Sequence, residues 1–326
     1  MQPKSGVWEK LSFFLSTHHT QQYLTNCYKK LNIKDIEKKG FENCYPFIYY
    51  LEHGKNYYEL CRVSPFSLQP VLLFYGMSQL LKACLLTTDP NYPESTSVLA
   101  HGATTRKRKK QSYRFLDDEV KVQKHGLFTL LADKMFHMKH LEGEKYTMKE
   151  LLQSIPELQD LLLFSKHEKI LYKLETPSYH TLRIPTAILD RFHMTEERFI
   201  RYIEETYKHL DIQHEKEKID KKALFFSTPI NKWNPLYSTP LTHHYYENTY
   251  YLPINREVSK LLPELLIHYL LLYNLSMISR YETDWWYDLL GNYASDDYPF
   301  IYQFLSVTAE KIPYYVYLYL MHHHIS

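Results

Sequence analysis

The sequence predicts an α+β fold that is predominantly α-helical, and two observations lead to this class. Long apolar segments at 65–88 and 263–281 lie near opposite ends of the 326-residue chain, and each has the length and composition of a buried helix. Short β-branched and aromatic segments, bounded by proline, glycine or charged turns, lie between them and are typical of strands. A helical core assembled from both ends of the chain, around a mixed segment, follows.

The predicted boundaries are those of one interwoven domain over residues 1–326. Its helical core takes about 1–100 and 255–326, and the mixed α/β insert takes about 112–254. A charged connector at 214–222 is the best candidate for an exposed turn.

Individual elements follow from local patterns. Apolar spacing over 5–31 predicts a helix or a helix pair, and helices return at 300–311 and 313–324. Pro70 and Pro263 stand where the two core helices begin. Further helices are expected to begin at the capping box formed by residues 147–150 and after Thr195. The predicted strands are 120–125, 169–175, 179–184, 223–228 and 248–254.

Neither core helix is predicted to cross a membrane. A membrane span needs about 20 predominantly apolar residues, whereas Lys82, His268, Asn274 and Arg280 are spread across these two segments. Buried helices of a soluble core are therefore favoured. The N-terminus shows no secretory signal, and the four cysteines form no Cys-x-x-Cys pair, so we expect reduced thiols and a cytoplasmic location.

Composition and motifs narrow the function. Lys plus Arg number 39 against 37 Asp plus Glu, so affinity for a polyanion must be local. The chain contains no Gly-x-Ser-x-Gly, Walker or Gly-x-Gly-x-x-Gly motif, and its adjacent histidines lack zinc-hydrolase spacing. We expect no metal and no cofactor, and a binding role is favoured over an enzymatic one.

The one concentrated charge is a basic run of five residues: Arg106, Lys107, Arg108, Lys109 and Lys110. These cations can bind phosphate on a nucleotide or RNA, and Tyr113 and Arg114 add a stacking ring and a fork-shaped donor. The alternative is a solvated loop whose charge the acidic residues at 117–119 neutralise.

Two His-Gly pairs, His101-Gly102 and His125-Gly126, are candidates for site residues or for packed turns. The last candidate is SRYETDWW, 279–286, at the end of the second core helix. Arg280 there is either a structural clamp paired with a nearby carboxylate or an anion-binding residue in a pocket walled by Trp285 and Trp286.

Tyrosine is unusually frequent, with 31 residues. Its amphipathic ring suits broad, half-buried surfaces, so a Tyr-rich interaction surface is one interpretation and codon bias is the other.

QPVLLFYGMSQLLKACLL, the His-Gly pair that follows it, and LSMISRYETDWW with the Tyr-rich tail resemble the YaaC-like proteins of bacilli over essentially the full length. The resemblance implies a soluble cytoplasmic bacterial protein, and IMP dehydrogenase as a partner in purine-nucleotide metabolism. We therefore expect a non-enzymatic regulatory protein that binds a partner protein.

The paired apolar helices are also similar to the HEPN class of helical domains, many of which are ribonucleases that use an Arg, four to six intervening residues and a His. This chain departs from that pattern, because Arg280 has no histidine after it before the distal tail. The alternative function is therefore an RNA-binding protein or a HEPN-like enzyme in which Arg280 meets His101 or His125.

Overall fold

The computed structural model divides the chain into two compact units, residues 1–152 with 265–326 and residues 153–264. The helical core is thus built from both ends of the chain, as predicted. Residues 113–152 belong to the first unit, and the second unit begins at residue 153. The described residues are 6–31, 33–105, 113–166, 169–178, 180–218, 220–254, 262–292 and 296–325.

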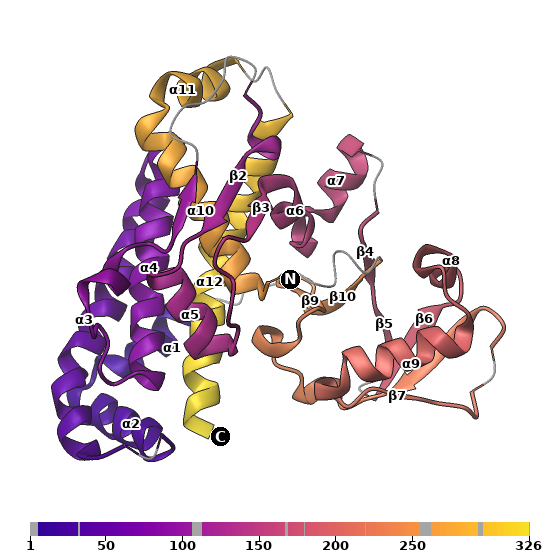
Figure 1. Cartoon of the computed structure of the whole chain (residues 1–326), viewed down its shortest axis with the longest axis horizontal. Coiled ribbons are helices and arrows are strands. Elements are labelled where there is room, and N and C mark those ends of the chain that lie inside the picture. The colour runs from indigo at the N-terminus through magenta and orange to yellow at the C-terminus, as the bar shows by residue number, and fades with distance from the viewer. Residues whose placement is uncertain are drawn as a thin grey trace. The chain divides into compact units, whose positions relative to one another are not determined.

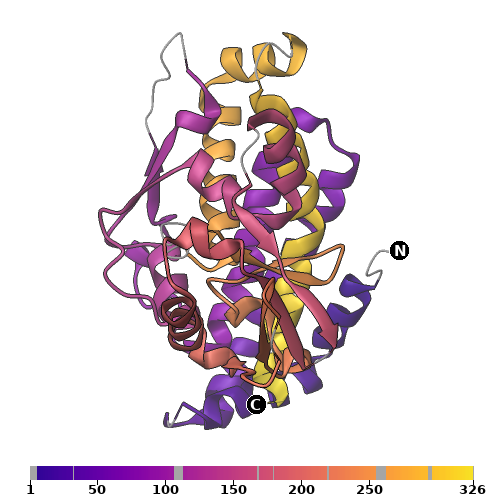
Figure 2. The same ribbon diagram turned by 90° about the vertical axis from the view of Figure 1, so that its right-hand side faces the viewer.

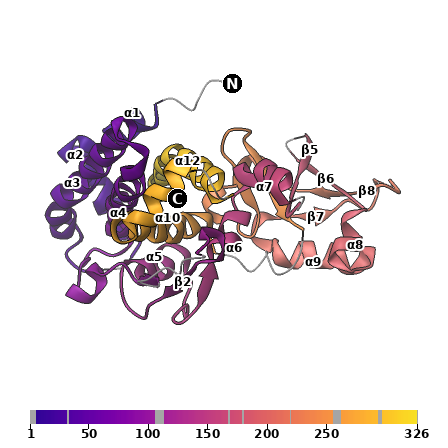
Figure 3. The same ribbon diagram turned by 90° about the horizontal axis from the view of Figure 1, so that it is seen from above.

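The first unit is a helical bundle, in which α3 packs on α2 and α4, and α4 packs on α12. Figures 1 and 3 show α4, α10 and α12 side by side, and Figure 2 shows α12 extending along the bundle. Apart from the two helices that follow the sheet strands, its α-helices are α1 (Val7–Leu11), α2 (Thr17–Lys29), α3 (Ile36–Val63), α4 (Gln69–Thr88), α10 (Glu264–Tyr281), α11 (Thr283–Asn292) and α12 (Asp297–Ile325).

The two predicted core helices are α4 and α10. Pro70 stands in the first turn of α4, as expected from its preset backbone angle. Phe74 of α4 and Tyr269 of α10 are fully buried and meet edge to face at 5.3 Å. Among the described residues, one segment, Phe66–Thr88, is apolar and long enough to cross a membrane, and 67% of it is buried in the fold. That burial is consistent with the core helix of a soluble protein.

Two helices differ from the sequence prediction. The pattern did not identify α3, which has 28 residues and contains Pro46. The helices expected at 300–311 and 313–324 form one helix, α12, which continues through Pro313.

A three-stranded antiparallel sheet completes the first unit, with β2 (Glu119–Val122) between β1 (Ala103–Thr105) and β3 (Lys145–Thr147). Val120 and Val122 are buried and Lys121 is exposed, which is the alternation of a strand with one covered face. Helix α5 (Leu127–Phe136) follows β2, and α6 (Met148–Gln153) follows β3.

The predicted capping box is present at the start of α6. The Thr147 backbone N–H donates to Glu150 Oε2 at 2.8 Å, and the Glu150 backbone N–H donates to Thr147 Oγ1 at 3.2 Å.

The second unit contains two antiparallel sheets, ordered β4-β10-β9 and β5-β6-β8-β7. All five predicted strand segments contain strands. The segment 120–125 overlaps β2 of the first unit. In the second unit, 179–184, 223–228 and 248–254 correspond to β6, β8 and β10, and 169–175 covers β4 and the start of β5. The elements of this unit are α7 (Gln159–Lys166), β4 (Leu171–Lys173), β5 (Glu175–Ser178), β6 (Thr181–Pro185), α8 (Ile188–Phe192), α9 (Glu196–Thr206), β7 (Gln213–His214), β8 (Ala223–Ser227), β9 (Thr242–His244) and β10 (Thr249–Pro253).

One face of the four-stranded sheet forms the core of the second unit. Leu182 and Ile184 of β6 and Phe226 of β8 are buried there together with Phe199 of α9. Arg183 lies between the two buried β6 residues in sequence and is therefore directed to the opposite face.

Candidate functional site

Arg280 lies in the last turn of α10, where a cation is favoured by the helix dipole. Its Nε donates to the Ser276 carbonyl at 2.9 Å, and its Nη1 donates to the Tyr75 hydroxyl at 3.2 Å. The guanidinium carbon lies 5.7 Å from the ring centre of Tyr75 and 5.1 Å from that of Tyr281. The side chain is therefore held against two aromatic rings at the end of the helix.

No carboxylate among the described residues pairs with Arg280. Glu282 and Asp284, the partners that the sequence suggested, form no ion pair with it, and neither does any other described acidic side chain. A half-buried cation without a counter-ion is costly, because its lost hydration is only partly replaced. An anionic ligand would supply the missing counter-charge.

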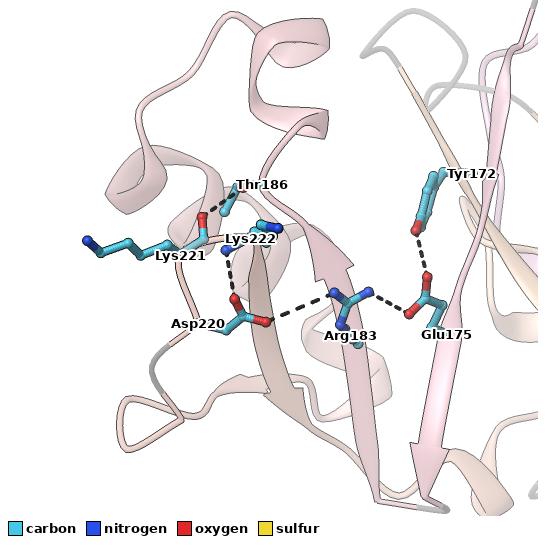
Figure 4. Close-up of polar contacts among 7 residues, drawn as sticks. All are labelled: Tyr172, Glu175, Arg183, Thr186, Asp220, Lys221 and Lys222. Carbon is cyan, nitrogen blue, oxygen red and sulfur yellow. Dashed lines mark hydrogen bonds and ion pairs between the residues drawn. The ribbon is translucent and has the colours of Figure 1, made fainter.

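Arg183 in the second unit is the contrasting case (Figure 4). Its Nη1 donates to Glu175 Oε2 at 2.7 Å, and its Nη2 lies 4.0 Å from Asp220 Oδ2. The Tyr172 hydroxyl donates to the other Glu175 oxygen at 3.3 Å. The hydrogen bond to Glu175 raises the pKa of Arg183. Arg183 is thus neutralised within the fold, whereas Arg280 is not.

His101 lies beside Arg280, on the segment that leads into β1. Its ring centre is 6.1 Å from that of Tyr75, which bonds Arg280, and 5.7 Å from that of Tyr273. The His101 carbonyl accepts hydrogen bonds from the Phe128 backbone N–H at 3.1 Å and the Tyr269 hydroxyl at 2.9 Å. Two elements therefore fix the backbone of this histidine.

The two His-Gly pairs meet through their glycines. Gly102 has φ +76° and Gly126 has φ +137°, and a β-carbon on Gly126 would overlap the Gly102 backbone. His125 is exposed, and its side chain forms no hydrogen bond, ion pair or ring contact with a described residue. Of the two histidines that the sequence offered, His101 is the one that the fold places near Arg280.

Burial and nearby charge both favour the neutral form of His101. Burial lowers the pKa of His101 most, and the cations of Arg280 and Lys82 lower it further. Burial also lowers the pKa of Lys82, whose ammonium lies 5.7 Å from the ring centre of Tyr50. We call Arg280, Lys82, His101, Tyr75 and Tyr273 the Arg280 cluster.

The predicted tryptophan wall lies elsewhere. Trp286 is fully buried, stacks on Phe66 at 6.1 Å and donates from Nε1 to the Ser67 carbonyl at 3.0 Å. Trp285 meets the edge of Tyr113 at 4.8 Å. The rings beside Arg280 are instead tyrosines.

The predicted basic run, Arg106–Lys110, lies outside the described residues. The residues on either side of it are anchored to α10 through Asp118. Asp118 Oδ2 accepts hydrogen bonds from the Tyr113 hydroxyl and from Asn274 Nδ2, both at 2.9 Å, and Asn274 also donates to Thr105 Oγ1 at 3.2 Å. Arg114 is exposed and lies 3.8 Å from Asp117, so its charge has a local partner.

Sequence reasoning missed Tyr75 and Lys82. In the sequence, Lys82 appears only as a charged residue that interrupts the apolar pattern of α4. A cation in an otherwise apolar helix was the available signal, and the structure shows that it is half-buried. Tyr75 carried no signal, because a single tyrosine in an apolar helix is ordinary core.

No group of His, Cys, Asp or Glu among the described residues is arranged to hold a metal ion.

Two surface cavities of the first unit are lined by residues outside the Arg280 cluster. One cavity has a volume of about 290 Å³ and is lined by Phe13, Phe14, His19, Gln22, Tyr23, Asn26 and Met321. The other, of about 260 Å³, is lined by Lys124, Thr129, Ala132, Asp133, Met138, Lys139, His140, Leu141 and Glu142.

The fold is that of a predominantly helical α+β protein with a cation- and tyrosine-rich cluster on its helical unit. The chain belongs to the YaaC-like protein family, whose model matches residues 12–320. No curated protein and no solved structure shows significant similarity to it.

Proposed function

We propose that this protein is a non-enzymatic, cytoplasmic binding protein that recognises a nucleotide phosphate at the Arg280 cluster. The observation that carries the proposal is that Arg280 is half-buried, in contact with two tyrosine rings and unpaired with any described carboxylate. Lys82 adds a second half-buried cation with no ion pair to a described residue.

The hydrogen-bond geometry of Arg280 favours a phosphate. Of its five N–H groups, three are used, on Ser276, Tyr75 and the sulfur of Met277. One N–H therefore remains on each terminal nitrogen, so both terminal nitrogens can still donate to the oxygens of a phosphate or carboxylate. The surrounding tyrosines favour a ligand that also carries an aromatic base.

The regulatory part of the proposal extends the family resemblance. A purine-nucleotide enzyme such as IMP dehydrogenase is the proposed partner protein, with the bound nucleotide as the signal that the partner's pathway produces. The chemistry of the Arg280 cluster supports the nucleotide, and affinity capture with and without nucleotide tests the partner.

Calorimetric titration tests the nucleotide. Inorganic phosphate, AMP, IMP, GMP and GTP are titrated into the wild type, into Arg280→Gln and into Arg183→Gln as a matched control. We expect Arg280→Gln to weaken binding at least tenfold, because a charge-assisted bidentate contact is worth about 1.5–3 kcal/mol. Arg183→Gln should bind like the wild type. Equal affinity in the wild type and Arg280→Gln would contradict the proposal.

A second candidate is an RNA-acting enzyme, and one observation favours it. His101 and Arg280 share contacts with Tyr75, and the charge of Arg280 lowers the pKa of His101. A neutral imidazole can accept the proton of a ribose 2′-hydroxyl while a guanidinium stabilises the charged phosphate. Cleavage of RNA to 2′,3′-cyclic phosphate ends, lost in His101→Asn and in Arg280→Gln alike, would identify this activity.

A further inference from the structure

Helix α3 carries an aromatic row that the phosphate site does not account for. Phe41, Tyr45, Tyr49, His53 and Tyr57 recur at intervals of four residues. The first three are exposed to 60%, 48% and 59%, so the row is not a core face. We call these five residues the α3 ladder.

The spacing of the ladder suits single-stranded nucleic acid. Four residues of α-helix rise about 6 Å, which is close to the distance per nucleotide of an extended single strand, so successive exposed rings can each face a successive base. Each step also turns the row by about 40° around the helix. The ladder therefore winds around α3, from rings that are exposed to one, Tyr57, that is half-buried.

The ladder leads to the Arg280 cluster. Tyr45 and Tyr49 have ring centres 6.0 Å apart, and His53 and Tyr57 have ring centres 4.8 Å apart. Tyr57 then stacks on Tyr75 at 6.1 Å with an interplanar angle of 26°. Tyr75 is the residue whose hydroxyl bonds Arg280, so the far end of the ladder, His53 and Tyr57, is in ring contact with the proposed phosphate site, while Tyr45 and Tyr49 form a separate ring pair further along the helix.

The charges along α3 favour stacking over electrostatic attraction as the source of affinity. Lys38 lies 3.9 Å from Glu42, and Lys55 lies 3.5 Å from Glu59, so these cations have partners on the same helix. Duplex nucleic acid has its bases paired inside and is bound mainly through phosphate. A face with rings and little net charge therefore fits an unpaired strand, whose bases are free to stack.

We infer that the ligand of the Arg280 cluster is a single-stranded polynucleotide whose bases stack on the α3 ladder while Arg280 and Lys82 bind its phosphates. This inference rests on the proposed phosphate site and extends it from a mononucleotide to a strand. With two cations in contact, the slope of log affinity against log salt should be about −1.4.

Fluorescence anisotropy with labelled 12-nucleotide U-only, A-only and deoxy-T probes, and with a 12-base-pair duplex, tests the strand. The ladder variant is the triple substitution Phe41→Ala, Tyr45→Ala and Tyr49→Ala. Its control is the double substitution Phe164→Ala and Tyr287→Ala, which removes rings that are also exposed, to 83% and 58%. All three altered ladder positions are exposed, so the fold should be retained, and circular dichroism checks this.

We expect the single strands to bind more tightly than AMP or the duplex, and the ladder variant to bind them at least tenfold more weakly, since each stacked base contributes roughly 5- to 150-fold. AMP binding should be unchanged in the ladder variant, and the control should match the wild type. Arg280→Gln should weaken the binding of both AMP and the single strands.

Three results separate the possible failures. If the strands bind no better than AMP, or the ladder variant binds them like the wild type, the ladder inference is wrong and the phosphate site stands. If neither AMP nor a strand binds, the proposed function itself fails. If the ladder variant instead loses self-association in sedimentation velocity with strand binding unchanged, α3 is a protein interface and the inference is overturned.

Discussion

The Tyr75 hydroxyl accepts a hydrogen bond of 3.2 Å from Arg280 Nη1, and this contact joins α4 to the end of α10. The same ring lies 6.1 Å from that of His101. Tyr75 thus orients the cation and lies against the histidine.

Replacing Tyr75 by Phe should keep the ring and remove the acceptor. We expect affinity for a nucleotide phosphate to fall about fivefold, since one hydrogen bond contributes roughly 1 kcal/mol when water can replace the lost partner. Thermal stability should change little. The control is Tyr287→Phe, whose hydroxyl bonds Ser67 Oγ at 3.4 Å. Calorimetric titration measures the affinity of both variants for the nucleotide. Equal affinity in the wild type, Tyr75→Phe and Tyr287→Phe would show that the Tyr75 hydroxyl does not position Arg280.

Phosphate binding should strengthen as the pH falls. The pKa of His101 is lowered in the fold, which favours the neutral ring, and a bound anion would raise that pKa and favour proton uptake. Affinity measured from pH 8 to pH 5.5 should therefore rise in the wild type and stay flatter in His101→Gln. The groups that face His101 are Arg280, Lys82, Tyr75 and Tyr273, together with the apolar ring of Phe74.

The stability of the free protein should have the opposite pH dependence at this residue. Because the unfolded chain holds His101 at its ordinary pKa of about 6.5, it binds more protons than the fold does below that pH. The contribution of neutral His101 to the free energy of unfolding is therefore fully present above about pH 6.5. It is lost as the pH falls through the lowered pKa of the folded state. Denaturant unfolding measures the free energy of unfolding of the wild type and of His101→Gln. The difference between the two should shrink as the pH falls through that window, and a difference that stays constant with pH would contradict this prediction.

Gly126→Ala should destabilise the first unit severely. The new β-carbon would overlap the Gly102 backbone, in a conformation of φ +137° that alanine rarely adopts, so we expect a loss of several kcal/mol. Gly143→Ala is the matched control, because Gly143 also has a positive φ, +87°, but nothing lies within 4 Å of its β-carbon position. It should cost only about 1 kcal/mol. Thermal unfolding of both variants measures the difference, and similar losses would mean that the glycine contact is not tight.

The thiols should be unreactive in the folded protein. Cys27, Cys44, Cys61 and Cys84 are free and buried, and burial raises the pKa of Cys27 and of Cys61 to about 11. Since the thiolate is the reactive form, a disulfide reagent at pH 8 should label the native protein slowly and all four thiols after denaturation. Rapid labelling of a native thiol would show that its helix opens readily.

Sequence alone determined the elements whose signals are local. Apolar length identified α4 and α10, and the spacing of Thr147 and Glu150 identified the start of α6, because burial pattern and capping act within a few residues. It failed for α3, whose aromatic residues occupy both exposed and buried positions and whose Gly54 breaks the pattern. That glycine lets α3 approach α4 closely, since a β-carbon there would meet Leu80.

The candidate site was decided by the tertiary structure. The sequence singled out Arg280 and offered His101 and His125 equally, but it predicted tryptophans as the wall, showed Lys82 only as a charged interruption of an apolar helix, and gave no sign of Tyr75. His101 reaches Arg280 because Gly102 packs on Gly126 and because Tyr269 and Phe128 hold the His101 carbonyl. These contacts join residues far apart in the chain, and their pairing depends on how helices and strands pack, which spacing along the sequence does not encode.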